Sequence, residues 1–263
     1  MSADIEGVAG IAAPDEARKG GAGYAVFRAQ MDAEVAAACE GAFAAGATEV
    51  VVKDAHGDGR NLSAAALPTP ARLVRGYNGH PFAMVQGLDE SFDAALFVGY
   101  HAAAGDGGNP LSHTLSSRKL HSIRLNGEPL SELAIHAHAA ASVGVPVVLV
   151  TGDQAICDEA VELVDGITTV AVKCGVGAST TSLHPADAID AVRQGAESAL
   201  AGASHPLPQR TAAWHLDIEY ADVATAYVRG FYPGAEQTGP RTVTRDCDDC
   251  FDMLRALVFL VGL

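Results

Sequence analysis

The sequence lacks any run of about 18 uninterrupted apolar residues, the length that a membrane-spanning helix needs. Its first residues, Met-Ser-Ala-Asp-Ile-Glu, contain neither the basic segment nor the apolar core of a secretory signal peptide, so none is expected. Basic residues are also scarce, because 17 Lys and Arg stand against 32 Asp and Glu, a formal charge of −15. An acidic surface repels phosphate backbones and anionic lipids, so we expect neither a nucleic-acid partner nor a membrane partner.

Cysteine is sparse as well, and the five thiols are an odd, scattered set: Cys39, Cys157, Cys174, Cys247 and Cys250. Such usage in a long chain indicates a reducing compartment, and we expect a cytoplasmic protein. The Cys247-Asp-Asp-Cys250 pair has no second pair to complete a structural zinc site, and two separate thiols at a helix start are the simpler interpretation.

Two common catalytic signatures are missing or incomplete. There is no G-x-S-x-G, which argues against an α/β-hydrolase serine enzyme. Gly175-Val-Gly177 has neither the third glycine nor the Lys-Ser/Thr ending of a phosphate-binding loop.

Strand and helix patterns alternate along the 263 residues, which predicts an α/β fold: three layers, α/β/α, with a largely parallel sheet. Asn126-Gly127 predicts a hairpin turn, and Pro129 is expected to open a helix that runs to residue 142. Strands are expected at 1–5, 49–53, 73–77, 94–100, 145–150, 168–172, 212–219 and 240–244, and further helices at 24–45, 153–164, 185–200, 221–228 and from 247.

A proline-bearing stretch at 202–210 is expected to be a linker. We therefore divide the chain into a catalytic α/β domain at 1–203 and a small α+β segment at 204–263 that packs on it.

Acidic and imidazole side chains fall at the carboxyl ends of three expected strands. Asp4 and Glu6 are two apart and so face the same side of the first strand, while His56 and His101 follow two others. Ligands bind at this edge in open α/β sheets, and Glu132 lies at the start of the helix expected after Pro129.

These oxygen and nitrogen donors suit zinc or a similar metal. Three carboxylates and two imidazoles are too many for one tetrahedral ion but fit two ions, with Asp4 bridging. Each residue taken alone is more often a surface or core residue, and the Asp4/Glu6 pair alone could equally lie on a solvated edge strand. The metal-site interpretation depends on finding several such residues together at strand ends.

Several motifs, in order and at similar spacing over most of the chain, resemble those of the D-aminopeptidase family of peptidases. The matching segments are Ser2-Ala-Asp4-Ile-Glu6-Gly7, Lys53-Asp-Ala-His56, Phe97-Val-Gly-Tyr-His101, Leu111-Ser-His113 and Gly127-Glu-Pro-Leu-Ser-Glu132-Leu. The resemblance implies a two-zinc aminopeptidase acting on short peptides with an N-terminal D-residue.

The resemblance also implies roles for individual residues. Asp4 would bridge two zinc ions, with Glu6 and His101 on one and His56 and Glu132 on the other. His113 would be the catalytic histidine, able to act as general acid or base or to stabilise an oxyanion. The family resemblance further implies pentamer rings stacked into a decamer.

Two residues close in sequence to the expected ligands each have two possible roles. Asp54 could orient the His56 imidazole or cap its own loop, and His136, four residues after Glu132, could approach the metals but is expected to pack elsewhere. Two other functions compete with the D-aminopeptidase interpretation. One is a metal-dependent amidohydrolase or aminopeptidase of other specificity, and the other is a non-catalytic peptide-binding transport accessory.

Overall fold

The computed structural model describes residues 1–202, 207–208, 211 and 213–262. Most of the expected linker at 202–210 therefore lies outside the described residues. Among the helices within these ranges, none is long and apolar enough to cross a membrane.

The larger of two sheets has the strand order β3-β2-β1-β4-β7-β8-β9 and is parallel except for its β8–β9 edge. This order places β2, β1 and β4 side by side, so their carboxyl ends share one edge. The strands of this sheet are β1 (Ser2–Ala3), β2 (Val51–Asp54), β3 (Arg72–Val74), β4 (Ala95–Tyr100), β7 (Val147–Asp153), β8 (Thr168–Val176) and β9 (Ser179–Ser182).

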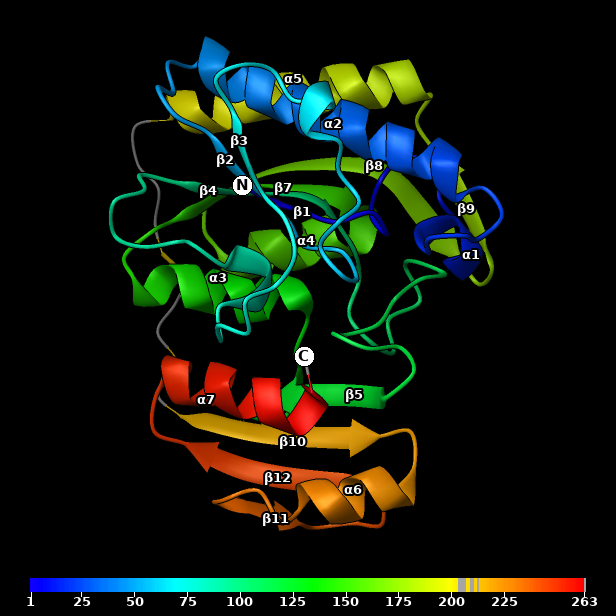
Figure 1. Ribbon diagram of the computed structural model, residues 1–263, viewed down its shortest axis with the longest axis vertical. Coiled ribbons are helices and arrows are strands. Elements are labelled where there is room, and N and C mark those ends of the chain that lie inside the picture. The colour runs from blue at the N-terminus through cyan, green and yellow to red at the C-terminus, as the bar shows by residue number, and fades with distance from the viewer. Residues whose placement is uncertain (203–206, 209–210, 212, 263) are drawn as a thin grey trace.

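Helices cover both faces of the large sheet, which confirms the predicted three-layer α/β/α arrangement (Figure 1). Helices α2 (Tyr24–Ala44) and α5 (Pro185–Ala201) pack together over one face, with the short α1 (Pro14–Ala17) beside α2. On the other face lie α3 (Glu132–Ser142) and α4 (Gln154–Leu163). Two apolar clusters fill these layers because the central strands are buried on both faces.

A smaller antiparallel sheet, ordered β11-β12-β10-β5-β6, lies beyond α3 (Figure 1). Helix α7 (Cys250–Leu257) packs between this sheet and α3 and continues into a π-helical turn at Val258–Gly262. Helix α6 (Val223–Arg229) contacts β10, β11 and β12 of the same sheet. Its strands are β5 (Leu120–Leu125), β6 (Glu128–Pro129), β10 (Trp214–Tyr220), β11 (Ala235–Gln237) and β12 (Thr242–Cys247). Strands β5 and β6 come from inside the segment 1–203, and the division at 203/204 stays a prediction.

The helix expected to open at Pro129 begins instead at Glu132, so that expectation was wrong. Asn126 and Gly127, with φ of 54° and 90°, turn the chain so that Pro129 pairs with Arg124 in the β5–β6 hairpin. An edge strand tolerates the missing proline N–H. Ser131 caps α3 by accepting a hydrogen bond from the Ala134 N–H, which makes Glu132 the first helical residue.

Candidate metal centre

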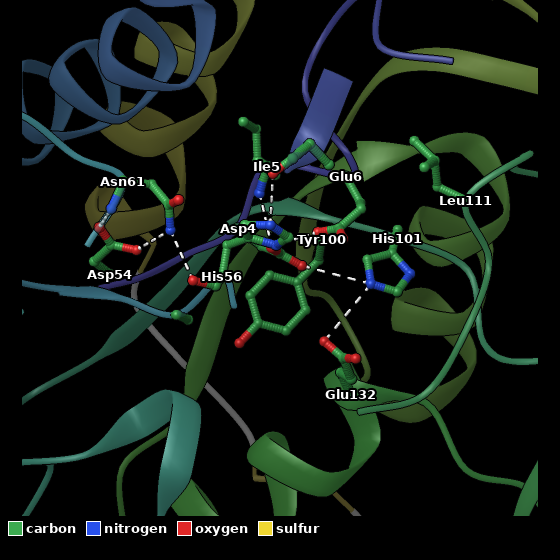
Figure 2. Close-up of polar contacts among 12 residues, drawn as sticks. Asp4, Ile5, Glu6, Asp54, His56, Asn61, Tyr100, His101, Leu111 and Glu132 are labelled. Carbon is green, nitrogen blue, oxygen red and sulfur yellow. Dashed lines mark hydrogen bonds and ion pairs between the residues drawn. The ribbon is translucent and has the colours of Figure 1, made fainter. Parts of the chain in front are cut away.

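The five predicted ligand residues meet at the shared carboxyl edge of β2, β1 and β4. Asp4 directly follows β1, His56 lies two residues after β2, and His101 directly follows β4. Glu132 approaches from the first turn of α3, as Figure 2 shows. All of these side chains except that of His56 are buried, so charges gather where little water can screen them.

The first group of donor atoms joins Asp4, Glu6 and His56. The His56 Nδ1 atom lies 3.1 Å from Asp4 Oδ1 and 2.6 Å from Glu6 Oε2. Its other ring nitrogen, Nε2, lies 2.9 Å from the carbonyl oxygen of Ala17.

The second group joins His101, His113 and Glu132. The His101 Nε2 atom lies 3.5 Å from Asp4 Oδ2 and 3.6 Å from Glu132 Oε2. His113 stacks on the His101 ring with centroids 4.5 Å apart, and its Nε2 lies 3.7 Å from Glu132 Oε1. Within each group, candidate ligand atoms lie within 4.8 Å of one another. In these groups Glu6 lies beside His56 and Glu132 beside His101, and the assignment of each residue to one of the two ions stays a prediction.

Backbone carbonyls fix the tautomers of the three imidazoles. A carbonyl oxygen only accepts hydrogen bonds, so the nitrogen facing it must carry the proton. His101 Nδ1 faces the carbonyl of Ala102 and His113 Nδ1 faces that of Leu111, each at 2.9 Å, as His56 Nε2 faces Ala17. The opposite nitrogen of each ring can therefore offer a lone pair to the centre.

The buried side chains of Asp4, His101 and Glu132 have strongly shifted pKa values. Burial and then the Glu6 carboxylate raise the pKa of Asp4 to about 7. Burial lowers the pKa of His101, but Glu132, Asp4 and Glu6 together raise it to about 10. Burial would raise the pKa of Glu132, but His101 outweighs it and lowers that pKa to about 2. Without a metal, protons must supply the positive charge that the carboxylates require.

Unsatisfied atoms indicate that a cation belongs at this position. The buried His101 Nε2 has no hydrogen-bond partner among the described residues, and Glu6 Oε2 approaches His56 Nδ1 without hydrogen-bond geometry. Buried polar atoms are nearly always partnered in folded proteins. Carboxylate oxygens and imidazole nitrogens fit zinc-like ions, and the two groups around Asp4 fit a pair of them.

A family model described as D-aminopeptidase matches residues 1–259. The chain belongs to the D-aminopeptidase family. A D-aminopeptidase from Bacillus subtilis (strain 168) is 35% identical over 269 residues, which cover 100% of this chain and 96% of that protein. A solved structure described as the Zn-dependent D-aminopeptidase DppA from Bacillus subtilis, a self-compartmentalizing protease, superposes with a TM-score of 0.92 at 32% identity, covering 100% of this chain and 96% of that one.

Asp54 supports the loop of this D-aminopeptidase family member rather than the His56 ring. Its Oδ1 atom accepts a hydrogen bond of 2.9 Å from Asn61 Nδ2, and its Oδ2 accepts one of 2.7 Å from the Leu62 N–H. Asn61 Nδ2 also donates to the His56 carbonyl oxygen at 2.7 Å (Figure 2). Of the two roles left open for Asp54, loop support is therefore the one that the structure shows.

Sequence reasoning missed two residues that hold the Glu6 backbone. The ammonium group of buried Lys173, on β8, donates to the carbonyl oxygens of Glu6 at 2.5 Å and Ile11 at 3.0 Å. Asn109 Nδ2 donates to the same Glu6 oxygen at 3.1 Å and to Asp153 Oδ2 at 2.7 Å. These contacts fix the segment from which the Glu6 carboxylate projects.

His136 packs away from the donor groups, as expected. Its Nδ1 donates to the Glu132 carbonyl oxygen at 2.7 Å, and its Nε2 accepts a hydrogen bond from the Met84 N–H at 3.3 Å. Burial lowers the pKa of His136 to about 4, so it is neutral at physiological pH. It joins α3 to the turn at Ala83–Val85 and thereby steadies the helix that carries Glu132.

Proposed function

We propose that this chain is a dinuclear zinc aminopeptidase that removes an N-terminal D-amino acid from short peptides. Membership of the D-aminopeptidase family supports the reaction, and the zinc dependence of the related Bacillus subtilis enzyme supports the metal. Asp4, Glu6, His56, His101 and Glu132 would hold two zinc ions, with Asp4 between them.

The position of Asp4 is the observation that carries this proposal. Its two carboxylate oxygens face different imidazoles, Oδ1 toward His56 and Oδ2 toward His101. A carboxylate oriented in this way can bridge two ions, with the remaining donors distributed around it.

Zinc bound here would polarise the peptide carbonyl and lower the pKa of an attacking water. The protein's own part is to orient its donors and to move a proton. The His113 Nδ1–H is engaged by the Leu111 carbonyl, which leaves Nε2 free to accept a proton and later return it to the departing amine. This side chain lies at the edge of the centre and is partly exposed, so substrate can reach it.

We also propose a homo-oligomer of pentamer rings stacked into a decamer. An exposed apolar surface on α6 and the turn after it supports self-association, with exposed fractions of 57% for Val223, 60% for Tyr227, 63% for Val228 and 72% for Phe231. The related enzyme is described as self-compartmentalizing. A cytoplasmic location completes the proposal and is supported by the five free thiols.

Amine release from D-Ala-D-Ala and L-Ala-L-Ala by zinc-loaded protein tests the proposed reaction. We expect cleavage of the D-peptide alone, and its loss together with bound zinc in Asp4→Ala. Asp93→Ala, which removes one carboxylate from an exposed loop, serves as the control and should behave as wild type. Cleavage by a metal-free Asp4→Ala protein would contradict the proposal, and saturable peptide binding without turnover in wild type would favour a binding accessory instead.

A further inference from the structure

A basic cavity of about 460 Å³ lies beside the loop that carries His56. Its walls come from the segment between α1 and α2, from α2 itself and from the loops that follow β2 and β3. Four cationic side chains line it: Lys19, Arg28, Arg60 and Arg75.

The charge in this cavity opposes that of the whole chain, which is −15. Only two carboxylates among the described residues pair with the four cations. Asp58 contacts Lys19 at 2.7 Å and Arg60 at 4.0 Å, and Asp32 contacts Arg28 at 3.2 Å. Two positive charges are therefore left without a matching carboxylate in a concave, partly enclosed place, where an anion is attracted most strongly.

Arg60 and Arg75 are the least satisfied of these cations. The nearest carboxylate oxygen to Arg60 is at the 4.0 Å limit of an ion pair. Arg75 has no carboxylate partner in the part of the chain that the structure describes, and its Nη2 makes only a long contact of 3.4 Å with the Arg60 carbonyl oxygen. Guanidinium groups present several donors in a planar fork that matches carboxylate and phosphate oxygens.

The fold brings these two arginines together. Arg75 directly follows β3 and Arg60 lies in the loop after the neighbouring strand β2, at the sheet edge where α/β proteins bind ligands. A hydrogen bond of 2.6 Å from the Gly76 N–H to the Gly59 carbonyl oxygen ties the two loops. Gly59 has a φ of 66° and Gly76 a φ of 73°, conformations that other residues rarely adopt, and a Cβ at Gly59 would lie 3.0 Å from the Gly76 nitrogen, so glycine lets the two loops approach each other.

The cavity wall is connected to the metal centre through Asn61. Arg28 Nε donates to the Asn61 carbonyl oxygen at 2.8 Å, and the Tyr24 hydroxyl donates to its side-chain oxygen at 2.9 Å. Asn61 in turn holds the His56 carbonyl oxygen. The cavity wall and the loop that positions a candidate zinc ligand therefore share Asn61.

We propose that this cavity binds the carboxylate or phosphate group of a small anionic ligand, with Arg60 and Arg75 as its principal contacts. The group can come from the C-terminal carboxylate of a peptide substrate, in which case the inference rests on the proposed function, or from a free anion such as phosphate.

Isothermal titration calorimetry of zinc-loaded protein with inorganic phosphate, at low ionic strength, tests the free-anion source without relying on activity. Arg75→Gln should weaken phosphate binding about 10-fold or more, since it removes a charge-assisted pair. Arg72→Gln is the matched control, because Arg72 lies on β3 but pairs with Glu49 outside the cavity, and it should bind as wild type. Phosphate that binds at the zinc ions instead would bind equally to all three proteins.

The peptide source is tested by comparing a dipeptide with its C-terminal amide. A carboxylate held in the cavity predicts a KM about 10-fold lower for the free acid than for the amide in wild type, and nearly equal values in Arg75→Gln. If neither peptide is hydrolysed, the same comparison is made by calorimetric binding, which separates this inference from the proposed function.

Weaker phosphate binding by Arg75→Gln supports the site with a free anion as its ligand. Loss of the preference for the free acid over the amide in Arg75→Gln supports the site with a peptide carboxylate as its ligand. The proposal is overturned if phosphate affinity and the acid-to-amide ratio are both the same in wild type and Arg75→Gln, or if wild type shows neither phosphate binding nor a preference for the free acid.

Discussion

Replacing Glu34 with Gln should stabilise the protein at alkaline pH. Glu34 lies on α2 and is fully buried, and burial raises its pKa to about 7 from a usual 4.5. Its Oε1 atom accepts hydrogen bonds of 2.9 Å from the Ala9 N–H and the Gln30 side chain, so it holds the segment that follows Glu6. Glutamine preserves this acceptor and carries no charge.

The magnitude follows from proton linkage. A carboxyl whose pKa is raised by folding favours the native state below about pH 4.5, and this contribution is lost as pH rises toward 7. Each pKa unit is worth about 1.4 kcal/mol, so the full difference is about 3 kcal/mol. The Glu34→Gln advantage in free energy of unfolding should be about 1 kcal/mol at pH 5.5 and about 3 kcal/mol at pH 8.

Urea unfolding of both proteins at these two pH values measures the advantage. Glu40→Gln, on an exposed position of the same helix, is the control and should differ from wild type by no more than about 0.5 kcal/mol at either pH. An advantage that is equal at pH 5.5 and pH 8, or a Glu34→Gln protein that is less stable at pH 8, would refute the linkage argument.

Three further substitutions test separate parts of the account. His113→Ala should lower kcat about 100-fold or more while zinc content, measured by mass spectrometry, stays at the wild-type value; loss of zinc would make His113 a ligand instead. Asn109→Ala should weaken zinc binding about 10-fold in a chelator competition, because the Glu6 carbonyl loses one of its two donors, and unchanged affinity would count against this positioning. Phe231→Glu should reduce the sedimentation mass toward that of one chain, and an intact oligomer would exclude the exposed α6 surface as an interface.

The parts of the fold and site that depend on strand periodicity were predictable from sequence. Apolar runs located several of the central strands, and the His56 and His101 side chains were expected just after two of them. The first strand was expected at 1–5 but ends at Ala3, so Asp4 and Glu6 follow the strand and do not lie on it. Their convergence follows from parallel pairing alone, because neighbouring parallel strands end at one edge. Glu132 was placed correctly at a helix start even though the helix opens three residues after Pro129.

Other features depend on contacts that no local pattern records. Strands β9 and β11 are short and mostly polar, so they lack the apolar alternation that identifies a strand. Lys173 and Asn109 donate hydrogen bonds to the Glu6 carbonyl oxygen, more than 100 residues away in the chain. Every residue has a backbone carbonyl, so the sequence does not indicate which one a distant side chain contacts. The pairing of His56 with Glu6 depends on side-chain distances that strand order does not set.

X-ray diffraction from crystals of the zinc-loaded protein, recorded on both sides of the zinc absorption edge, tests the central claim most directly. The account predicts two anomalous peaks per chain, on either side of the Asp4 carboxylate, with Glu6, His56, His101 and Glu132 completing the ligands. The same map decides which imidazole joins which carboxylate. A single peak, or zinc bound away from Asp4, would contradict the dinuclear centre.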